Sequence, residues 1–249
     1  MTSEDLCFTA GGERLAATRI VSRSGKAPGV VSFHGLGVTA NRGRIRYLLD
    51  HLAEHGVSSI CFDFSGNGES SGEFASSSLR IRAAESLAAA KLLAETEPRA
   101  IIGTSMGAHL AALVSPAIRP SSLVLFCPAA YPEQVVDEKF DASFVKFNNR
   151  VLAPEALRAS PALQALRRFT GDLLVVAARQ DQVIPAAVID LYLESAALAR
   201  TRRVIWLDGS DHFVHPWLQQ HPAERAAVLQ AVRDTILGLP ERNRRTEPA

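Results

Sequence analysis

Short apolar runs rich in β-branched residues recur along the chain, and most of them are separated by segments with helical spacing. Runs of this length, bounded by glycine or polar residues, are typical of buried strands. We therefore expect strands over residues 6–10, 13–21, 29–35, 57–64, 99–104, 122–127, 172–180 and 201–208. The first two runs are joined by Gly11 and Gly12, which predicts an opening hairpin.

Helical spacing is clearest between residues 42 and 55, where apolar residues recur at i, i+3, i+4 and i+7. These residues are Ile45, Leu48, Leu49 and Leu52. The pattern predicts an amphipathic helix. A second, alanine-rich helix is expected from about 79 to 95, and a third begins near Ser105. Because strands alternate with helices, we expect an α/β fold with a mostly parallel central sheet covered by helices on both faces.

Composition limits the classes of partner. The chain has 249 residues, of which 47% are hydrophobic, and this favours a single domain over 1–249 with an unstructured tail at about 239–249. Lysine plus arginine exceed aspartate plus glutamate by only one, 27 against 26, which argues against nucleic acid and favours a small molecule. With no apolar signal core and no run long enough to span a membrane, we expect a cytoplasmic protein.

The three cysteines, Cys7, Cys61 and Cys127, are widely spaced and stand in apolar stretches. An odd number with this spacing forms neither a disulfide framework nor a metal-ligand pattern. We expect reduced core residues, and neither a metal nor an organic cofactor is implied.

One pentapeptide contains a candidate catalytic residue. Residues 103–107, GTSMG, place Ser105 between two glycines where a strand should end and a helix should begin. In a nucleophile elbow a sharp, strained turn holds the serine, and small neighbours let the strand and helix approach. The alternative is a chance G-x-S-x-G match, which the flanking elements make less favourable. Ser105 is therefore the candidate nucleophile.

A serine hydroxyl is a weak nucleophile and needs a histidine base oriented by an acid. Asp181 directly follows the strand predicted over 172–180, and His212 follows the last predicted strand. This order, serine then acid then histidine, is the one expected for an elbow on a parallel sheet. Asp208 remains open as a rival acid, although it is close to His212 in sequence.

Other histidines have structural interpretations. His109 lies one helical turn after the serine and is expected to be a partly buried residue of that helix. His215 and His221 belong to the final helical region, where we expect them on the surface.

A glycine-rich loop after the third predicted strand, residues 34–37 (HGLG), can point a backbone N–H into the site. The N–H groups of Leu36 and Met106 are the expected oxyanion donors. His34 has two interpretations: a general base, or, more plausibly, a residue that holds the loop in shape and borders the substrate pocket.

Five segments together resemble the α/β-hydrolase superfamily: HGLG at 34–37, FDFSGNGESSG at 62–72, GTSMG at 103–107, RQDQVIP at 179–185 and GSDHF at 209–213. The resemblance implies the α/β-hydrolase fold, and it makes residues 63–70 a structural turn that supports the oxyanion loop. The glycine-rich segment and the helix after it are most similar to the branch of cinnamoyl and feruloyl esterases and monoacylglycerol lipases. HGLG in place of HGGG does not support the hormone-sensitive lipase branch.

In this superfamily the middle of the chain, about 128–170 here, usually holds a lid, and we expect a short helical one. Proline favours helix starts at 153–155 and 160–161. Phe140, Phe144 and Phe147 fall at i, i+4 and i+7, an aromatic stripe that either packs in the core or borders the substrate pocket.

The expected function is hydrolysis of a carboxylic ester or thioester of a small to medium acyl or aryl group, through an acyl-enzyme. The alternatives are a peptidase or C–C bond hydrolase with the same triad, and a non-catalytic binding protein. Arg42, Arg44 and Arg46 leave open a carrier-bound acyl group, but their spacing of two favours a solvated helix surface.

Overall fold

The computed structural model describes residues 1–27, 29–93, 100–141, 144 and 154–240. Its centre is an eight-stranded sheet in the order β1-β2-β4-β3-β5-β6-β7-β8. The strands are β1 Thr2–Ala10, β2 Glu13–Val21, β3 Val30–Phe33, β4 Ser59–Phe62, β5 Ala100–Thr104, β6 Ser122–Phe126, β7 Asp172–Ala178 and β8 Thr201–Leu207. The first two form the expected antiparallel hairpin, and β3 to β8 are parallel. All eight predicted strands are confirmed.

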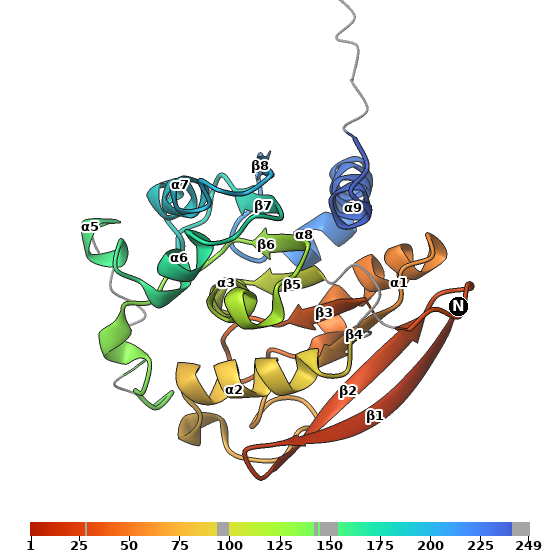
Figure 1. Cartoon of the computed structure of the whole chain (residues 1–249), viewed down its shortest axis with the longest axis horizontal. Helices are drawn as coiled ribbons and strands as arrows, with labels where there is room; N and C mark the ends of the chain where they lie inside the picture. The colour runs from red at the N-terminus through yellow and green to blue at the C-terminus, as the bar shows by residue number, and fades with distance from the viewer. Residues whose placement is uncertain (28, 94–99, 142–143, 145–153, 241–249) are drawn as a thin grey trace, which may run out of the picture.

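Helices cover both faces of the sheet, as predicted. They are α1 Arg46–Glu54, α2 Leu79–Ala90, α3 Met106–Ile118, α5 Pro154–Leu157, α6 Pro161–Leu166, α7 Ala186–Ser195, α8 Val214–Gln220 and α9 Pro222–Leu237. One hydrophobic cluster joins the sheet to α2, α3, α6 and α7, and a second joins its other face to α1, α8 and α9 (Figure 1). Within the described residues, none of these helices has the length and apolar character needed to span a membrane.

The amphipathic helix predicted over 42–55 is divided. Residues Arg42–Ile45 form a 3-10 turn, and α1 follows it directly. The Asn41 side chain accepts a hydrogen bond from Gly43 N–H at 3.0 Å and caps the turn. The four predicted apolar residues are all buried, so the helix face is confirmed even though its first turn is tighter than expected.

The order of the strands brings several loops together. The chain runs from β3 to β4 on one side and then to β5 on the other side of β3, so the direction of winding reverses there. In parallel sheets, ligands bind outside the carboxyl ends of the strands at such a reversal. The loops after β3 and β5 meet at this edge of the sheet.

The middle segment is described in part. Between β6 and β7 the structure has a 3-10 turn at Glu133–Val135 and the helices α5 and α6. Both helices begin at proline, as predicted. Leu163 and Leu166 of α6 are fully buried in the main cluster. Phe147, and the part of the predicted tail from 241 onward, lie outside the described residues.

The expectation that all three cysteines belong to the core was wrong for Cys7. Cys61 and Cys127 are buried, but Cys7 is exposed. The reason is the alternation of β1, where Leu6, Phe8 and Ala10 face inward and the residues between them face solvent.

Candidate active site

Ser105 stands at the sharp turn between β5 and α3. Its backbone has φ 53° and ψ −113°, a region that L-residues rarely adopt. A Cβ atom at Gly103 would lie 2.4 Å from the carbonyl oxygen of Gly107, and one at Gly107 would lie 2.2 Å from that of Phe33. Both glycines are therefore required by close contacts of α3 with β5 and β3.

A continuous chain of hydrogen bonds runs from Ser105 through His212 to Asp181. Ser105 Oγ lies 3.1 Å from His212 Nε2, and His212 Nδ1 lies 2.8 Å from Asp181 Oδ2. A carboxylate can only accept, so Nδ1 carries the proton and Nε2 is left to accept the serine proton. The predicted serine, histidine and acid thus come together from three different loops.

The environment of Asp181 keeps it ionised. Burial, the largest single effect, would raise the pKa of Asp181, but the hydrogen bond and charge of His212 together with two backbone hydrogen bonds lower it below its ordinary value. The N–H groups of Val183 and Ile184 both donate to its Oδ1 at 2.8 Å and act in the same direction. The carboxylate is therefore available to orient an imidazole.

Asp208, the rival acid, lies elsewhere. Its side chain is 91% exposed, and its partner is Arg179 at 3.6 Å. The acid in contact with His212 is Asp181.

The oxyanion loop lies against the serine. A Cβ atom at Gly35 would lie 3.5 Å from Ser105 Cβ, an ordinary van der Waals distance, so the loop packs directly beside the serine. Within the described residues, the N–H groups of Leu36 and Met106 donate to no protein acceptor. Met106 is also the first residue of α3, where N–H groups have no partner within the helix. Both groups are free to bind an oxyanion.

His34 holds this loop in shape. Phe64 N–H donates to His34 Nε2 at 3.1 Å, so Nδ1 carries the proton and donates to Gly35 O at 2.8 Å. With both ring nitrogens engaged, His34 has no free lone pair to act as a base. Of the two interpretations, the structure supports the hydrogen-bonding one.

The turn at 63–70 supports the later part of the same loop, at Gly37 and Val38. Asn67 Nδ2 donates to the carbonyl groups of Gly37 at 2.8 Å and Val38 at 3.1 Å. The buried Arg82 in turn donates to Asn67 Oδ1 at 2.7 Å, which fixes the orientation of the amide. The carbonyl groups of Gly37 and Val38 thus have a hydrogen-bond partner in the turn after β4.

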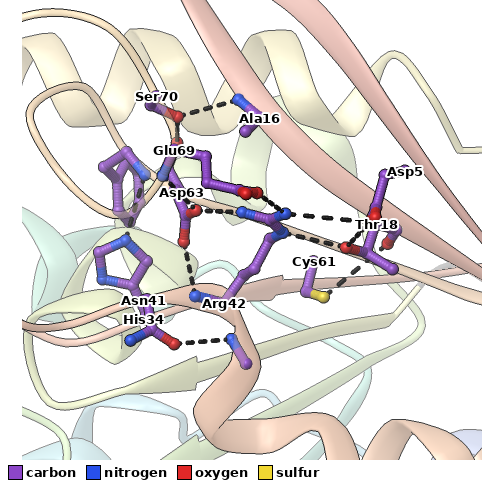
Figure 2. Close-up of polar contacts among 12 residues, drawn as sticks. Asp5, Ala16, Thr18, His34, Asn41, Arg42, Cys61, Asp63, Glu69 and Ser70 are labelled. Carbon is purple, nitrogen blue, oxygen red and sulfur yellow. Dashed lines mark hydrogen bonds and ion pairs between the residues drawn. The ribbon is translucent and has the colours of Figure 1, made fainter.

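Arg42 anchors the end of the same loop, and the expectation of a solvated surface was wrong for it. Its side chain is 14% exposed. Figure 2 shows the guanidinium between Asp63 and Glu69, with which it forms ion pairs, and Thr18, whose Oγ1 accepts from Nε at 3.0 Å. The backbone N–H of Arg42 also donates to Asp63 Oδ1 at 2.7 Å. Spacing along the chain could not reveal a partner 21 residues away.

A small cavity of about 80 Å³ opens beside Ser105 and His212. Residues from three loops line it, among them His34, Leu36, Arg44, Ile45, Thr104, Phe213, Val214 and His215. His34 and Leu36 thus border the cavity beside Ser105 and His212.

Phe140 and Phe144 of the middle segment do not line this cavity. Phe140 and Phe144 are buried in the main cluster with ring centroids 4.7 Å apart. The Phe140 ring also contacts Phe74 and the guanidinium of Arg82. Neither is among the residues that line the cavity at Ser105, and their pocket role stays a prediction.

The expectation that His215 lies on the surface was wrong. The residue is buried, with Nε2 2.7 Å from Thr104 Oγ1 and Nδ1 3.2 Å from the Tyr47 hydroxyl. It lies at the start of α8, between Val214 and Leu218, which turn toward the core. His109, also fully buried, accepts from Tyr131 N–H at 3.4 Å and has the structural role expected.

Burial disfavours the charged form of these histidines. Desolvation lowers the pKa of His34 and His109 to about 3 and that of His215 to about 4, and for His34 and His215 nearby arginines add to the effect. All three histidines are therefore neutral in the folded protein near neutral pH.

We expect stability to fall steeply on acidification. An unfolded histidine binds a proton below a pKa of 6.5, whereas these three stay neutral in the folded state. The unfolded state thus binds more protons than the folded state. The stability that the three neutral histidines contribute is fully present above pH 6.5 and is lost as the pH falls below it. Each histidine contributes a slope of about 1.4 kcal/mol per pH unit.

Urea unfolding between pH 6.5 and 4.5 measures this slope. His109→Asn keeps an acceptor for Tyr131 N–H and removes one titrating group, so its slope should be shallower by about 1.4 kcal/mol per pH unit. Equal slopes for the two proteins would contradict the assignment.

The side chains of Cys127, Asp181 and His212 also come within 4.8 Å of one another, as metal ligands do. Both nitrogens of His212 are already engaged, and burial, followed by the charge of Asp181, raises the pKa of the Cys127 thiol. A thiol that remains protonated is a poor ligand. The geometry favours the serine chemistry.

Comparisons with known proteins identify the family and the fold. A family model described as the alpha/beta hydrolase family matches residues 30–235. No curated protein matches the chain significantly.

Solved structures share the fold. A thioesterase domain from the curacin biosynthetic pathway is 16% identical over 96% of this chain and 100% of that one, with a TM-score of 0.67. Est1E from Butyrivibrio proteoclasticus, solved with ferulic acid, is 20% identical over 89% and 99%, with a TM-score of 0.66. CarC, a serine hydrolase involved in carbazole degradation, is 17% identical over 93% and 100%, with a TM-score of 0.65.

Proposed function

The chain belongs to the alpha/beta hydrolase family, and from this membership we propose that it is a serine hydrolase that cleaves a carboxylic ester or thioester through an acyl-enzyme. The observation that carries the proposal is the unbroken hydrogen-bond chain from Asp181 through His212 to Ser105. The 3.1 Å separation of Ser105 Oγ and His212 Nε2 is within the reach of a general base.

The first half of the reaction forms the acyl-enzyme. His212 Nε2 takes the Ser105 proton as Oγ attacks the carbonyl carbon, and the Leu36 and Met106 N–H groups bind the negative oxygen. Asp181 stabilises the imidazolium that forms. His212 then gives its proton to the departing alcohol or thiol, and the acyl group stays on Ser105.

Water completes the cycle. His212 takes a proton from water, which attacks the acyl carbon, and a second tetrahedral intermediate forms in the same oxyanion site. Its collapse returns the proton to Ser105 Oγ and releases the acid. No group outside the triad and the two N–H donors is required.

Cavity size bears on the acyl group. The volume of about 80 Å³ is roughly half that of an engineered cavity that holds benzene, about 150 Å³. We therefore propose a short acyl group inside the cavity, with the larger part of the substrate outside it. The likeness to Est1E with ferulic acid and to a thioesterase domain supports the ester or thioester class, and membership of the feruloyl esterase branch remains a proposal.

An acyl-enzyme has a kinetic signature that tests this proposal. For 4-nitrophenyl acetate and 2,4-dinitrophenyl acetate, kcat should be the same, because both form the same acetyl-enzyme, while kcat/KM differs. Methanol added to the assay should yield methyl acetate. If kcat follows the leaving group and no methyl acetate forms, the acyl-enzyme mechanism is wrong.

Labelling separates the remaining alternatives. A fluorophosphonate should react with Ser105, since only an activated serine does so at a useful rate, and peptide mapping identifies the site. A non-catalytic binding protein would not be labelled. A peptidase or C–C bond hydrolase would also be labelled, and its triad can cleave activated acetates too, so an unactivated ester and the matching amide are compared: an esterase should hydrolyse the ester at a much higher kcat/KM than the amide.

A further inference from the structure

The cavity beside Ser105 has a positively charged border. Arg42 and Arg44 are both among its lining residues, and no aspartate or glutamate is among the described residues that line it. Arg42 is neutralised by Asp63 and Glu69, with which it forms ion pairs. Arg44 is therefore the source of net charge at this border.

Arg44 is exposed and has no acidic partner. Within the described part of the chain it takes part in no ion pair, whereas Arg46, two residues later, pairs with Asp50 at 2.6 Å. One nitrogen of Arg44, Nη2, donates to the carbonyl oxygen of Thr39 at 3.2 Å and to its Oγ1 at 3.3 Å. These bonds hold the guanidinium beside the oxyanion loop and leave Nε and Nη1 available to a ligand.

The positive charge of Arg44 affects the pKa of histidines on both sides of the cavity. It adds to the lowering of the pKa of His34, after burial and Arg82, and of His215, after burial alone. These two histidines border the cavity from the loop after β3 and from α8, so the positive field of Arg44 extends across it.

We propose that Arg44 binds a carboxylate or phosphate of the substrate while the ester or thioester carbonyl lies at Ser105. The proposal rests on the proposed function and narrows its substrate class to compounds with a short acyl group and an anionic group farther along. A guanidinium offers two parallel N–H groups to such an anion. The cavity is too small to hold the whole of such a substrate, so the anion lies outside it, where Arg44 is exposed.

Matched substrates measure this selectivity. 4-Acetoxybenzoate and its methyl ester, methyl 4-acetoxybenzoate, release nearly isosteric phenols that differ by one negative charge. Monomethyl and dimethyl succinate place the same difference at the end of a short acyl group. For at least one pair, the ratio of kcat/KM for the anionic over the neutral compound should fall about tenfold or more in Arg44→Gln. Added salt should lower the wild-type ratio.

Arg46→Gln is the control, because it removes the same charge from a neighbouring residue that does not line the cavity. It should keep the wild-type ratio. The proposal is overturned if Arg44→Gln keeps the wild-type ratios for both pairs, or if Arg46→Gln lowers them equally, which would indicate a general field.

The two proposals fail in distinguishable ways. If the neutral acetate is hydrolysed and Ser105 is labelled, but Arg44→Gln does not change the ratios, only the anion site is wrong. If no ester is hydrolysed and Ser105 is not labelled, the proposed function fails, and the anion site fails with it.

Discussion

Ser105→Ala should lower kcat for an activated ester by about 10³-fold or more, to the activity left by the oxyanion donors and binding. The side chain removed is the proposed nucleophile, and no other described hydroxyl contacts His212. The fold should survive, because the backbone N–H of Ser105 donates to Phe126 O at 2.8 Å and does not depend on the side chain. Steady-state kinetics measures the loss of kcat, and a thermal unfolding curve measures whether the fold survives.

A Ser105→Ala protein that folds normally and keeps a tenth of the wild-type rate would falsify the assignment of the nucleophile. Loss of activity together with loss of fold would point to a structural role instead.

Asp181→Asn should lower kcat by about 10⁴-fold, as in triads where an amide replaces the acid. An asparagine amide can donate to Nδ1, which favours the tautomer with the proton on Nε2, and that nitrogen can then no longer accept from Ser105. The loss should appear in kcat and in kcat/KM alike, since the interaction matters most when the imidazolium forms.

Asp208→Asn provides the matched control, because it makes the same chemical change one strand away. Its side chain is 91% exposed and forms no hydrogen bond to His212, so its effect should be less than about twofold. The opposite ranking of the two variants would place the acid at Asp208.

Local pattern was sufficient to predict the fold and the three triad candidates. Strand runs separated by glycine and polar residues are local signals. Ser105 directly follows β5, and Asp181 and His212 lie in the loops that follow β7 and β8. Residues at the carboxyl ends of parallel strands meet at one edge, so chain order alone indicates that they are close. Each of these inferences needs only neighbours in the sequence.

Two of the residues that were predicted wrongly, Arg42 and His215, depend on partners far along the chain, whereas Cys7 was misplaced by the local alternation of β1. The Arg42 side chain is mostly buried because Asp63 and Glu69, from the segment after β4, form ion pairs with it. His215 is buried because α8 turns its first residues toward Thr104 and Tyr47, residues of other elements. The apolar neighbours of His215 at 214 and 218 are the one local signal that indicated a buried face.

The two halves of the site are held by different sets of contacts, which meet at the end of β3, where a Cβ atom at Gly107 would lie 2.2 Å from Phe33 O and 2.6 Å from His34 O. The oxyanion loop is held by the turn after β4, through His34, Asn67 and Arg42, whereas the serine is held by the contacts of Gly103 and Gly107 with their surroundings. During divergence of the sequence, substitutions around residues 63–70 can therefore adjust how strongly the oxyanion is bound without disturbing the nucleophile. The elbow does not tolerate such substitutions, because Gly103 and Gly107 are in close contact with the backbone around them. The rate of turnover can therefore change through substitutions on the β4 side of β3, while the β5 side, which carries the serine, stays constant.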